Sequence, residues 1–293
     1  MLTGVYPSEH RARMMDMRYQ RDAAPHVADL FARAGYRTGA FVGTNVLAGE
    51  TGIAFGFETY DDQVDPGLTY GFAWGLIHDM QSLAVSFVPS LALNGQPHWF
   101  QDYQRPAEDV LPRAAAWLAE DDPRPSFALI NLYDVHWPYL PEPEFEARVP
   151  QAAPYTGPVD GFAHRSSSLP TGHAFTPEDD AHLTRLYHAE LLELDEQLHA
   201  FFAGLDLERT ALLITSDHGE AFGEGGRYEH SDILEPQIEI PFIVRAAGGG
   251  APQTSAAPVT GLDVAPTLLG LAGLDVPPAM RGHDLTRSTP DAA

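Results

Sequence analysis

One short run of residues carries the groups best suited to chemistry. Asp217 and His218 come directly after the apolar run Ala211 to Thr215, and a glycine-rich loop follows them. A carboxylate beside an imidazole offers one hard oxygen and one borderline nitrogen, which suits a divalent cation. His230 lies twelve positions after His218, near enough for the loop to return it to the same place. The run indicates a metal site, although an isolated Asp-His pair is more often an ordinary turn.

A second run has the same character. Asp134, His136 and Tyr139 follow the apolar segment 126–133, and Trp137 and a proline lie between the last two. Such a turn alone is more often structural than functional. Two strand ends that each deliver an Asp and a His make a stronger case, because parallel strands present their carboxyl ends along one edge of a sheet.

Composition narrows the classes of function. The 293 residues carry a net charge of −24 and no lysine, so they offer no basic stripe for nucleic acid. They contain no cysteine, which excludes disulfides, thiolate metal sites and a cysteine nucleophile within them. No apolar run is long enough to span a membrane. The start lacks the apolar region of a signal peptide, so we expect a cytoplasmic protein if Met1 is the true start.

The pattern of apolar residues predicts the elements that position these groups. We expect helices at 24–35, 109–118, 177–205 and 263–271, and strands at 36–42, 126–133, 211–215, 238–245 and 259–262. Because helices and strands alternate, the predicted fold is α/β, with a largely parallel sheet covered by helices on both faces. We expect one domain over residues 1–285 and a disordered tail over 286–293. Residues 72–102 lack a clear period and are expected to form a helical insertion or a lid.

A series of segments, in order, resembles the sulfatase branch of the alkaline phosphatase superfamily. They include DVHWPYLPE at 134–142, LYHAELLELDEQL at 186–198, TSDHGEAFGE at 215–224, and the segments 1–7, 34–41, 56–62 and 262–274. The resemblance implies an alkaline-phosphatase-like fold with a metal-assisted ester hydrolysis site. The metal would be Ca, Mg or Mn, and the substrate a small-molecule or saccharide ester of sulfate or phosphate. The resemblance implies nothing about the oligomeric state.

The resemblance also implies roles for individual residues. Asp217 and His218 would be metal ligands, and His230 would contact the sulfate or phosphate group or stabilise the leaving oxygen. His136 would reach the ester as a hydrogen-bond donor or a general acid, and Tyr139 would contact the substrate. The residues Thr44 and Asn45 occupy the place where many family members have a lysine and a histidine, and they could donate hydrogen bonds to an anion.

The chain departs from the family pattern at its start. In the family, the first core strand with its metal-binding aspartates and a Cys or Ser nucleophile precede the segment that resembles residues 1–7. The cysteine becomes formylglycine there, which is not possible within this chain. We therefore expect the first core strand to be missing and the chain to be truncated, with a signal peptide possible upstream of Met1.

Three functions stay open from the sequence. The first is sulfate ester hydrolysis, impaired by loss of the nucleophile, so that aryl sulfates are hydrolysed weakly or not at all. The second is a phosphodiesterase, phosphonate hydrolase or phosphoryl transferase on the same scaffold, because sulfuryl and phosphoryl groups share tetrahedral, anionic geometry. The third is a non-catalytic sulfatase-like fragment that binds anions.

Overall fold

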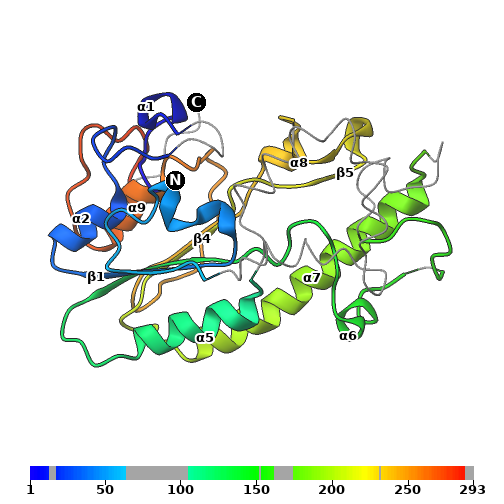
Figure 1. Cartoon of the computed structure of the whole chain (residues 1–293), viewed down its shortest axis with the longest axis horizontal. Helices are drawn as coiled ribbons and strands as arrows, with labels where there is room; N and C mark the ends of the chain where they lie inside the picture. Colours follow the sequence, from blue (N-terminus) through cyan, green and yellow to red (C-terminus); the bar gives the residue numbers. More distant parts are fainter. Residues whose placement is uncertain (13–17, 64–104, 152, 162–173, 231, 288–293) are drawn as a thin grey trace.

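The computed structural model describes residues 1–12, 18–63, 105–151, 153–161, 174–230 and 232–287 (Figure 1). The insertion or lid expected at 72–102 lies outside these ranges, as does most of the tail expected at 286–293. No helix within the described ranges is long and apolar enough to cross a membrane. The assignment of residues 1–285 to one domain stays a prediction.

A parallel three-stranded sheet forms the frame, in the order β2-β1-β3. Its strands are β1 (Arg37–Val42), β2 (Thr59–Asp61) and β3 (Ser126–Asn131). In the register, Ala40 lies opposite Leu129 and Tyr60. The strands predicted at 36–42 and 126–133 are therefore confirmed, and their carboxyl ends point to the same edge.

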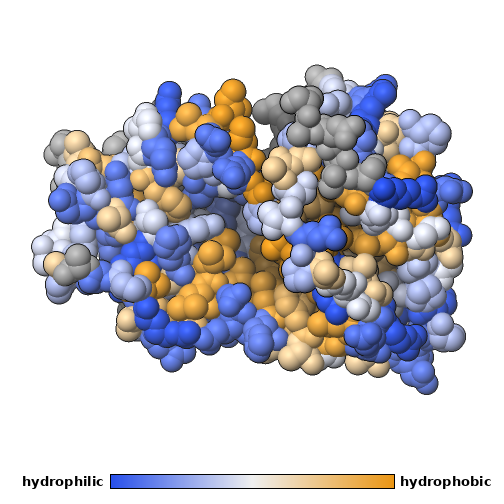
Figure 2. All heavy atoms as spheres, turned by 180° about the vertical axis from the view of Figure 1, so that it is seen from behind, coloured by the Kyte–Doolittle hydropathy of each residue, from blue (hydrophilic) through white to orange (hydrophobic). Residues whose placement is uncertain are grey.

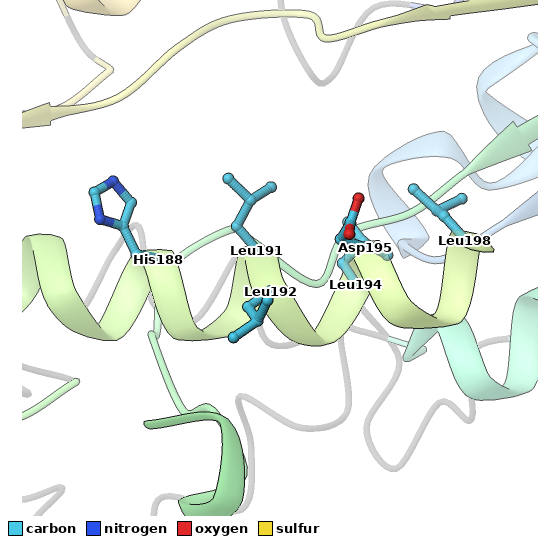
Figure 3. Close-up of a pocket in the computed structure, with 6 residues that line it drawn as sticks. All are labelled: His188, Leu191, Leu192, Leu194, Asp195 and Leu198. Carbon is cyan, nitrogen blue, oxygen red and sulfur yellow. The ribbon is translucent and has the colours of Figure 1, made fainter. Parts of the chain in front are cut away.

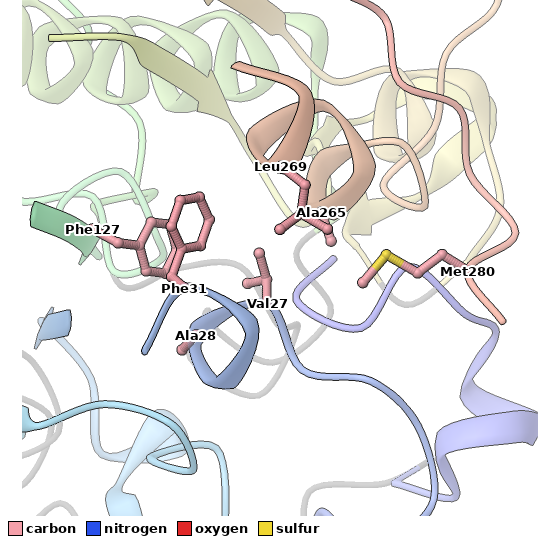
Figure 4. Close-up of a cluster of buried hydrophobic side chains, with 7 residues drawn as sticks. All are labelled: Val27, Ala28, Phe31, Phe127, Ala265, Leu269 and Met280. Atoms are coloured by element: carbon pink, nitrogen blue, oxygen red, sulfur yellow. The ribbon is translucent and has the colours of Figure 1, made fainter. Parts of the chain in front are cut away.

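Helices cover both faces of this sheet, as the alternation predicts. On one face Phe41 packs against Val110, Ala114 and Trp117 of α5 (Ala107–Leu118). On the other, Phe127 of β3 packs with α2 (Val27–Arg33) and α9 (Val264–Leu271). Figure 4 shows this second cluster, drawn from three separate parts of the chain. The cluster consists of Val27, Ala28, Phe31, Phe127, Ala265, Leu269 and Met280.

A separate pair of strands leads into the Asp-His run. The strand β4 (Leu212–Thr215) pairs with β7 (Phe242–Arg245) in antiparallel orientation. Another antiparallel pair joins β5 (Ala221–Phe222) to β6 (Tyr228–Glu229). The long helix α7 (Pro177–Ala203) runs beneath these strands and alongside α5 (Figure 1).

The shorter elements complete the chain. They are α1 (Pro7–His10), η1 (Asn45–Leu47), η2 (Gly49–Thr51), α6 (Pro143–Glu146), η6 (Glu224–Gly226) and α8 (Glu235–Ile238).

Two predictions near the C-terminus need correction. Residues 259–262 form no strand. Instead a turn begins at Thr260, whose backbone amide donates to the Asp263 carboxylate at 2.7 Å. The strand expected from residue 238 begins only at Phe242, since residues up to Ile238 form the single turn α8.

The surface keeps more apolar area than the sequence suggests. Ile243 and Val244 of β7 are 55% and 39% exposed, although both side chains are apolar. Within the described residues β4 and β7 form a sheet of only two strands, so their faces are incompletely covered. Figure 2 shows apolar residues gathered along a hollowed band on the back of the molecule.

One buried histidine carries a prediction about stability. The His26 side chain lies among the rings of Tyr19, Phe55 and Phe57, its residue is 2% exposed, and neither ring nitrogen has a hydrogen-bond partner in the described structure. Burial lowers the pKa of His26 to about 4. The folded protein therefore disfavours the charged ring, and stability is lost as pH falls from the unfolded pKa of 6.5 towards 4.

We expect the substitution His26→Phe to relieve this acid sensitivity. The free energy of unfolding of the variant relative to the parent should rise by about 2 kcal/mol between pH 7 and pH 5. Urea unfolding at several pH values measures this difference. A difference that stays constant with pH would contradict the assignment.

Candidate functional site

The Asp217–His218 run lies where β4 ends and a tight loop begins. The loop is fixed against α8, because the Gly219 amide donates to the Gln237 carbonyl at 2.8 Å. A Cβ atom at Gly219 would lie 2.1 Å from the Pro236 carbonyl oxygen, so only glycine fits this close approach. The His218 Nδ1 atom lies 2.8 Å from the Gly219 carbonyl, and this leaves Nε2 available to a ligand.

Three imidazole rings gather at this point. The rings of His218 and His230 stack with centroids 3.8 Å apart, and the His136 ring meets them edge-on at 6.5 and 5.3 Å. His136 is fixed from behind by stacking on Tyr133 at 4.2 Å and by a 2.6 Å contact between Nδ1 and the Trp137 carbonyl. The two runs that the sequence singled out thus meet in one cluster.

The buried side chain of Glu220 connects this cluster to the protein interior by contacts with His230 and Tyr139. Its side chain is 7% exposed, and Oε2 lies 3.4 Å from Nδ1 of His230. It also shares a hydrogen bond with the hydroxyl of Tyr139. The hydrogen bond to Glu220 raises the pKa of His230, whereas burial lowers the pKa of His136. The cluster therefore pairs a ring that favours the cationic form with one that favours the neutral form.

The oxygen and nitrogen atoms of Asp217 and His218 suit a divalent cation, as two of its ligands. Nε2 of His218 lies 3.8 Å from Oδ2 of Asp217, a separation that one ion could bridge with bonds of about 2.0–2.5 Å. The Asp217 side chain is 82% exposed and free to adjust. Among the described residues no group of three or more His, Asp or Glu converges on one ion, so the pair alone falls short of the usual three or four ligands.

The other predicted site residues lie less directly in the cluster. Tyr139 is 3% exposed and packs with Val159, Leu183 and Leu186, so it supports Glu220 from within. Thr44 is also 3% exposed, and its hydroxyl accepts from the Val46 amide at 3.3 Å. A direct contact of Tyr139, Thr44 or Asn45 with substrate stays a prediction.

The sequence reasoning missed Glu220. Its position directly after the Asp-His-Gly run was the available signal, because a carboxylate behind a site histidine commonly fixes the orientation of that ring. Its burial, which makes it a partner of His230, depends on packing that no short motif reveals.

A hollow lies elsewhere, on α7. It measures about 430 Å³. Figure 3 shows Leu191, Asp195 and Leu198 pointing from one side of the helix into this space. None of the predicted site residues lines it. We place the chemistry at the histidine cluster, because the hollow lacks a converging set of polar groups.

Comparisons with known proteins identify the family of the chain. The family model described as Sulfatase matches residues 1–274. Arylsulfatase K of Danio rerio is 30% identical over 132 residues, which cover 44% of this chain and 25% of that protein. The low-salt glycan biosynthesis sulfotransferase of Haloferax volcanii is 29% identical over 206 residues, covering 68% of this chain and 46% of that protein. The chain thus spans about a quarter to a half of the curated relatives it matches.

A solved structure confirms the fold. The phosphonate monoester hydrolase SpPMH from Silicibacter pomeroyi superposes with a TM-score of 0.64 and 21% identity, covering all of this chain and 66% of that chain. At this identity the likeness establishes the α/β fold alone.

Proposed function

The chain belongs to the sulfatase family, and we propose that it carries metal-binding and leaving-group residues of a sulfate ester hydrolase. The observation that carries the proposal is the cluster of His136, His218 and His230 beside Asp217. Asp217 and His218 would hold Ca²⁺, Mg²⁺ or Mn²⁺. A small-molecule or saccharide sulfate ester would be the substrate.

The histidines divide the remaining work. His230, with Glu220 at its Nδ1, would direct Nε2 towards the sulfuryl oxygens and stabilise negative charge on them. His136, whose Nδ1 lies against a carbonyl, would direct Nε2 to the ester oxygen. Burial favours its neutral form, so it would donate a proton from Nε2 only after the negative charge of a bound ester has favoured the cationic ring. When bound, the metal would polarise a sulfuryl oxygen as a Lewis acid.

Transfer or hydrolysis of a phosphorus ester is the second candidate. The phosphonate monoester hydrolase of like fold favours keeping it. A sulfuryl and a phosphoryl group would contact the same histidines with similar geometry. The relative affinity for sulfate and phosphonate esters must therefore distinguish the first function from the second. A non-catalytic anion-binding role is the third candidate, since the 293 residues contain no cysteine to supply a formylglycine nucleophile.

Ligand binding, more than turnover, tests this proposal. We expect 4-nitrophenyl sulfate to bind more tightly in the presence of Mn²⁺ than with a chelator, and to bind more tightly than phenyl phenylphosphonate. We expect slow or no release of 4-nitrophenol, because no formylglycine can form from cysteine in this chain. Calorimetry and an absorbance assay on the same protein measure both.

The outcomes separate the candidates. Tighter binding of the phosphonate ester would favour the second function over the first. Metal-dependent binding of inorganic sulfate without binding of either ester would favour the third. No metal-dependent binding of any of these anions would overturn the proposal.

A further inference from the structure

A buried glutamate on α7 lies behind the segment that carries His136. Glu190 is 7% exposed, and its Oε1 accepts a hydrogen bond from the Leu140 amide at 2.5 Å. One turn further along α7, Glu193 accepts from the Glu142 amide at 3.3 Å. Two carboxyl groups spaced three residues apart on one helix thus bind the alternate amides of an extended segment.

This segment connects directly to the histidine cluster. Leu140 follows Tyr139, whose hydroxyl is bonded to Glu220, and Glu220 in turn contacts His230. His136 lies four residues before Leu140. It contacts Tyr133 and Trp137 locally and meets the rings of His218 and His230. A shift of the segment would therefore displace two of the three imidazole rings together.

We propose that Glu190 is a positioning residue, which clamps the segment 136–140 onto α7 and so holds His136 and the Tyr139–Glu220–His230 chain in place. Its relevance to catalysis rests on the function proposed above. Leu140 is 44% exposed and contributes little packing of its own, so the clamp adds to the packing of Tyr139 against Leu183 and Leu186 of α7.

The chemical form of the clamp follows from its surroundings. Burial raises the pKa of Glu190 to about 9, and the nearby Asp134 and Glu193 act in the same direction. Its second oxygen, Oε2, has no hydrogen-bond partner in the described structure. The group is therefore a neutral acid at pH 7 that accepts one hydrogen bond, and glutamine is its nearest uncharged analogue.

Amide hydrogen exchange of Leu140 tests the clamp without reference to activity. We expect Glu190→Ala and Glu190→Asp to speed exchange at Leu140 by at least about tenfold, because the acceptor is removed or drawn back by one methylene. Glu190→Gln should keep the parent rate, since its carbonyl can accept the same hydrogen bond. Glu196→Gln is the control, because Glu196 lies on the same helix but pairs with Arg148 at the surface.

Sulfate affinity in the presence of Mn²⁺ is the second readout. The alanine and aspartate variants should bind about tenfold more weakly, as loss of an outer-shell partner does, and the glutamine variant should bind as the parent does. If the alanine variant does not fold, the aspartate and glutamine pair carries the comparison. Unchanged exchange at Leu140 in the aspartate variant, or failure of glutamine to rescue, would overturn the clamp. A parent that binds no sulfate would refute the proposed function, while the exchange data would still decide on the clamp.

Discussion

Replacing His218 by alanine is expected to abolish measurable Mn²⁺ binding. His218 supplies the only nitrogen ligand of the Asp217–His218 pair, and its Nδ1 contact with Gly219 directs Nε2 outward. The loss should exceed the roughly 10–100-fold that follows removal of an outer-shell partner. Titration calorimetry of Mn²⁺ into the parent and the variant measures the difference.

Two further variants make this prediction specific. Asp217→Asn removes the charge of the oxygen ligand and should weaken the metal at least as much as an outer-shell loss. His199→Ala removes a histidine exposed on α7, outside the cluster, and should leave Mn²⁺ affinity unchanged. Equal losses in all three variants, or none in His218→Ala, would show that the ion binds elsewhere.

The second large effect concerns pH and the buried acid of α7. Glu190 has a pKa of about 9 in the folded protein and a reference value of 4.5, so the folded state keeps a proton that the unfolded state releases. Stability from this group is therefore full below pH 4.5 and is lost as pH rises towards 9. The whole change is on the order of 5 kcal/mol.

Glu190→Gln removes this titration and isolates it from every other group. The free energy of unfolding of the variant relative to the parent should increase steadily between pH 5.5 and 8.5. Urea unfolding at intervals across this range measures it. A difference that does not change with pH would mean that Glu190 is already ionised in the folded protein.

The local pattern predicted the elements that carry the site. The pattern of apolar residues predicted β1, β3, β4 and α7 within a few residues. The meeting of His136 with His218 and His230 was expected from one rule, that functional groups lie at the carboxyl ends of strands, although β3 and β4 belong to different sheets within the described residues. Spacing along the chain was sufficient here because each histidine lies within a few residues of a strand end or a tight loop.

Pairing between distant strands was harder to predict. The sequence indicates a largely parallel sheet, whereas β4 and β7 are antiparallel. A parallel crossover is usually a helix of a dozen or more residues. The connection here contains instead a two-stranded hairpin and the single turn α8. An apolar run carries no record of strand direction, so β7 could be recognised as a strand but not oriented.

The roles of buried polar groups were also hidden. Glu190 reads as one more acid on a charged helix, and its burial emerges only when Leu140 packs across α7. Tyr139 was predicted only as a substrate contact, and the bond of its hydroxyl to Glu220 could not be foreseen. Side chains of this kind depend on the tertiary structure, which a short motif does not contain.

The most direct test of the proposed site is paramagnetic broadening by Mn²⁺ of histidine ring signals in the NMR spectrum of the protein. We predict that the ring signals of His136, His218 and His230 broaden together at substoichiometric Mn²⁺, and that added Ca²⁺ restores them. The signal of the exposed His199 should remain sharp. Broadening that begins at His199, or that spares His218, would contradict a metal site at the end of β4.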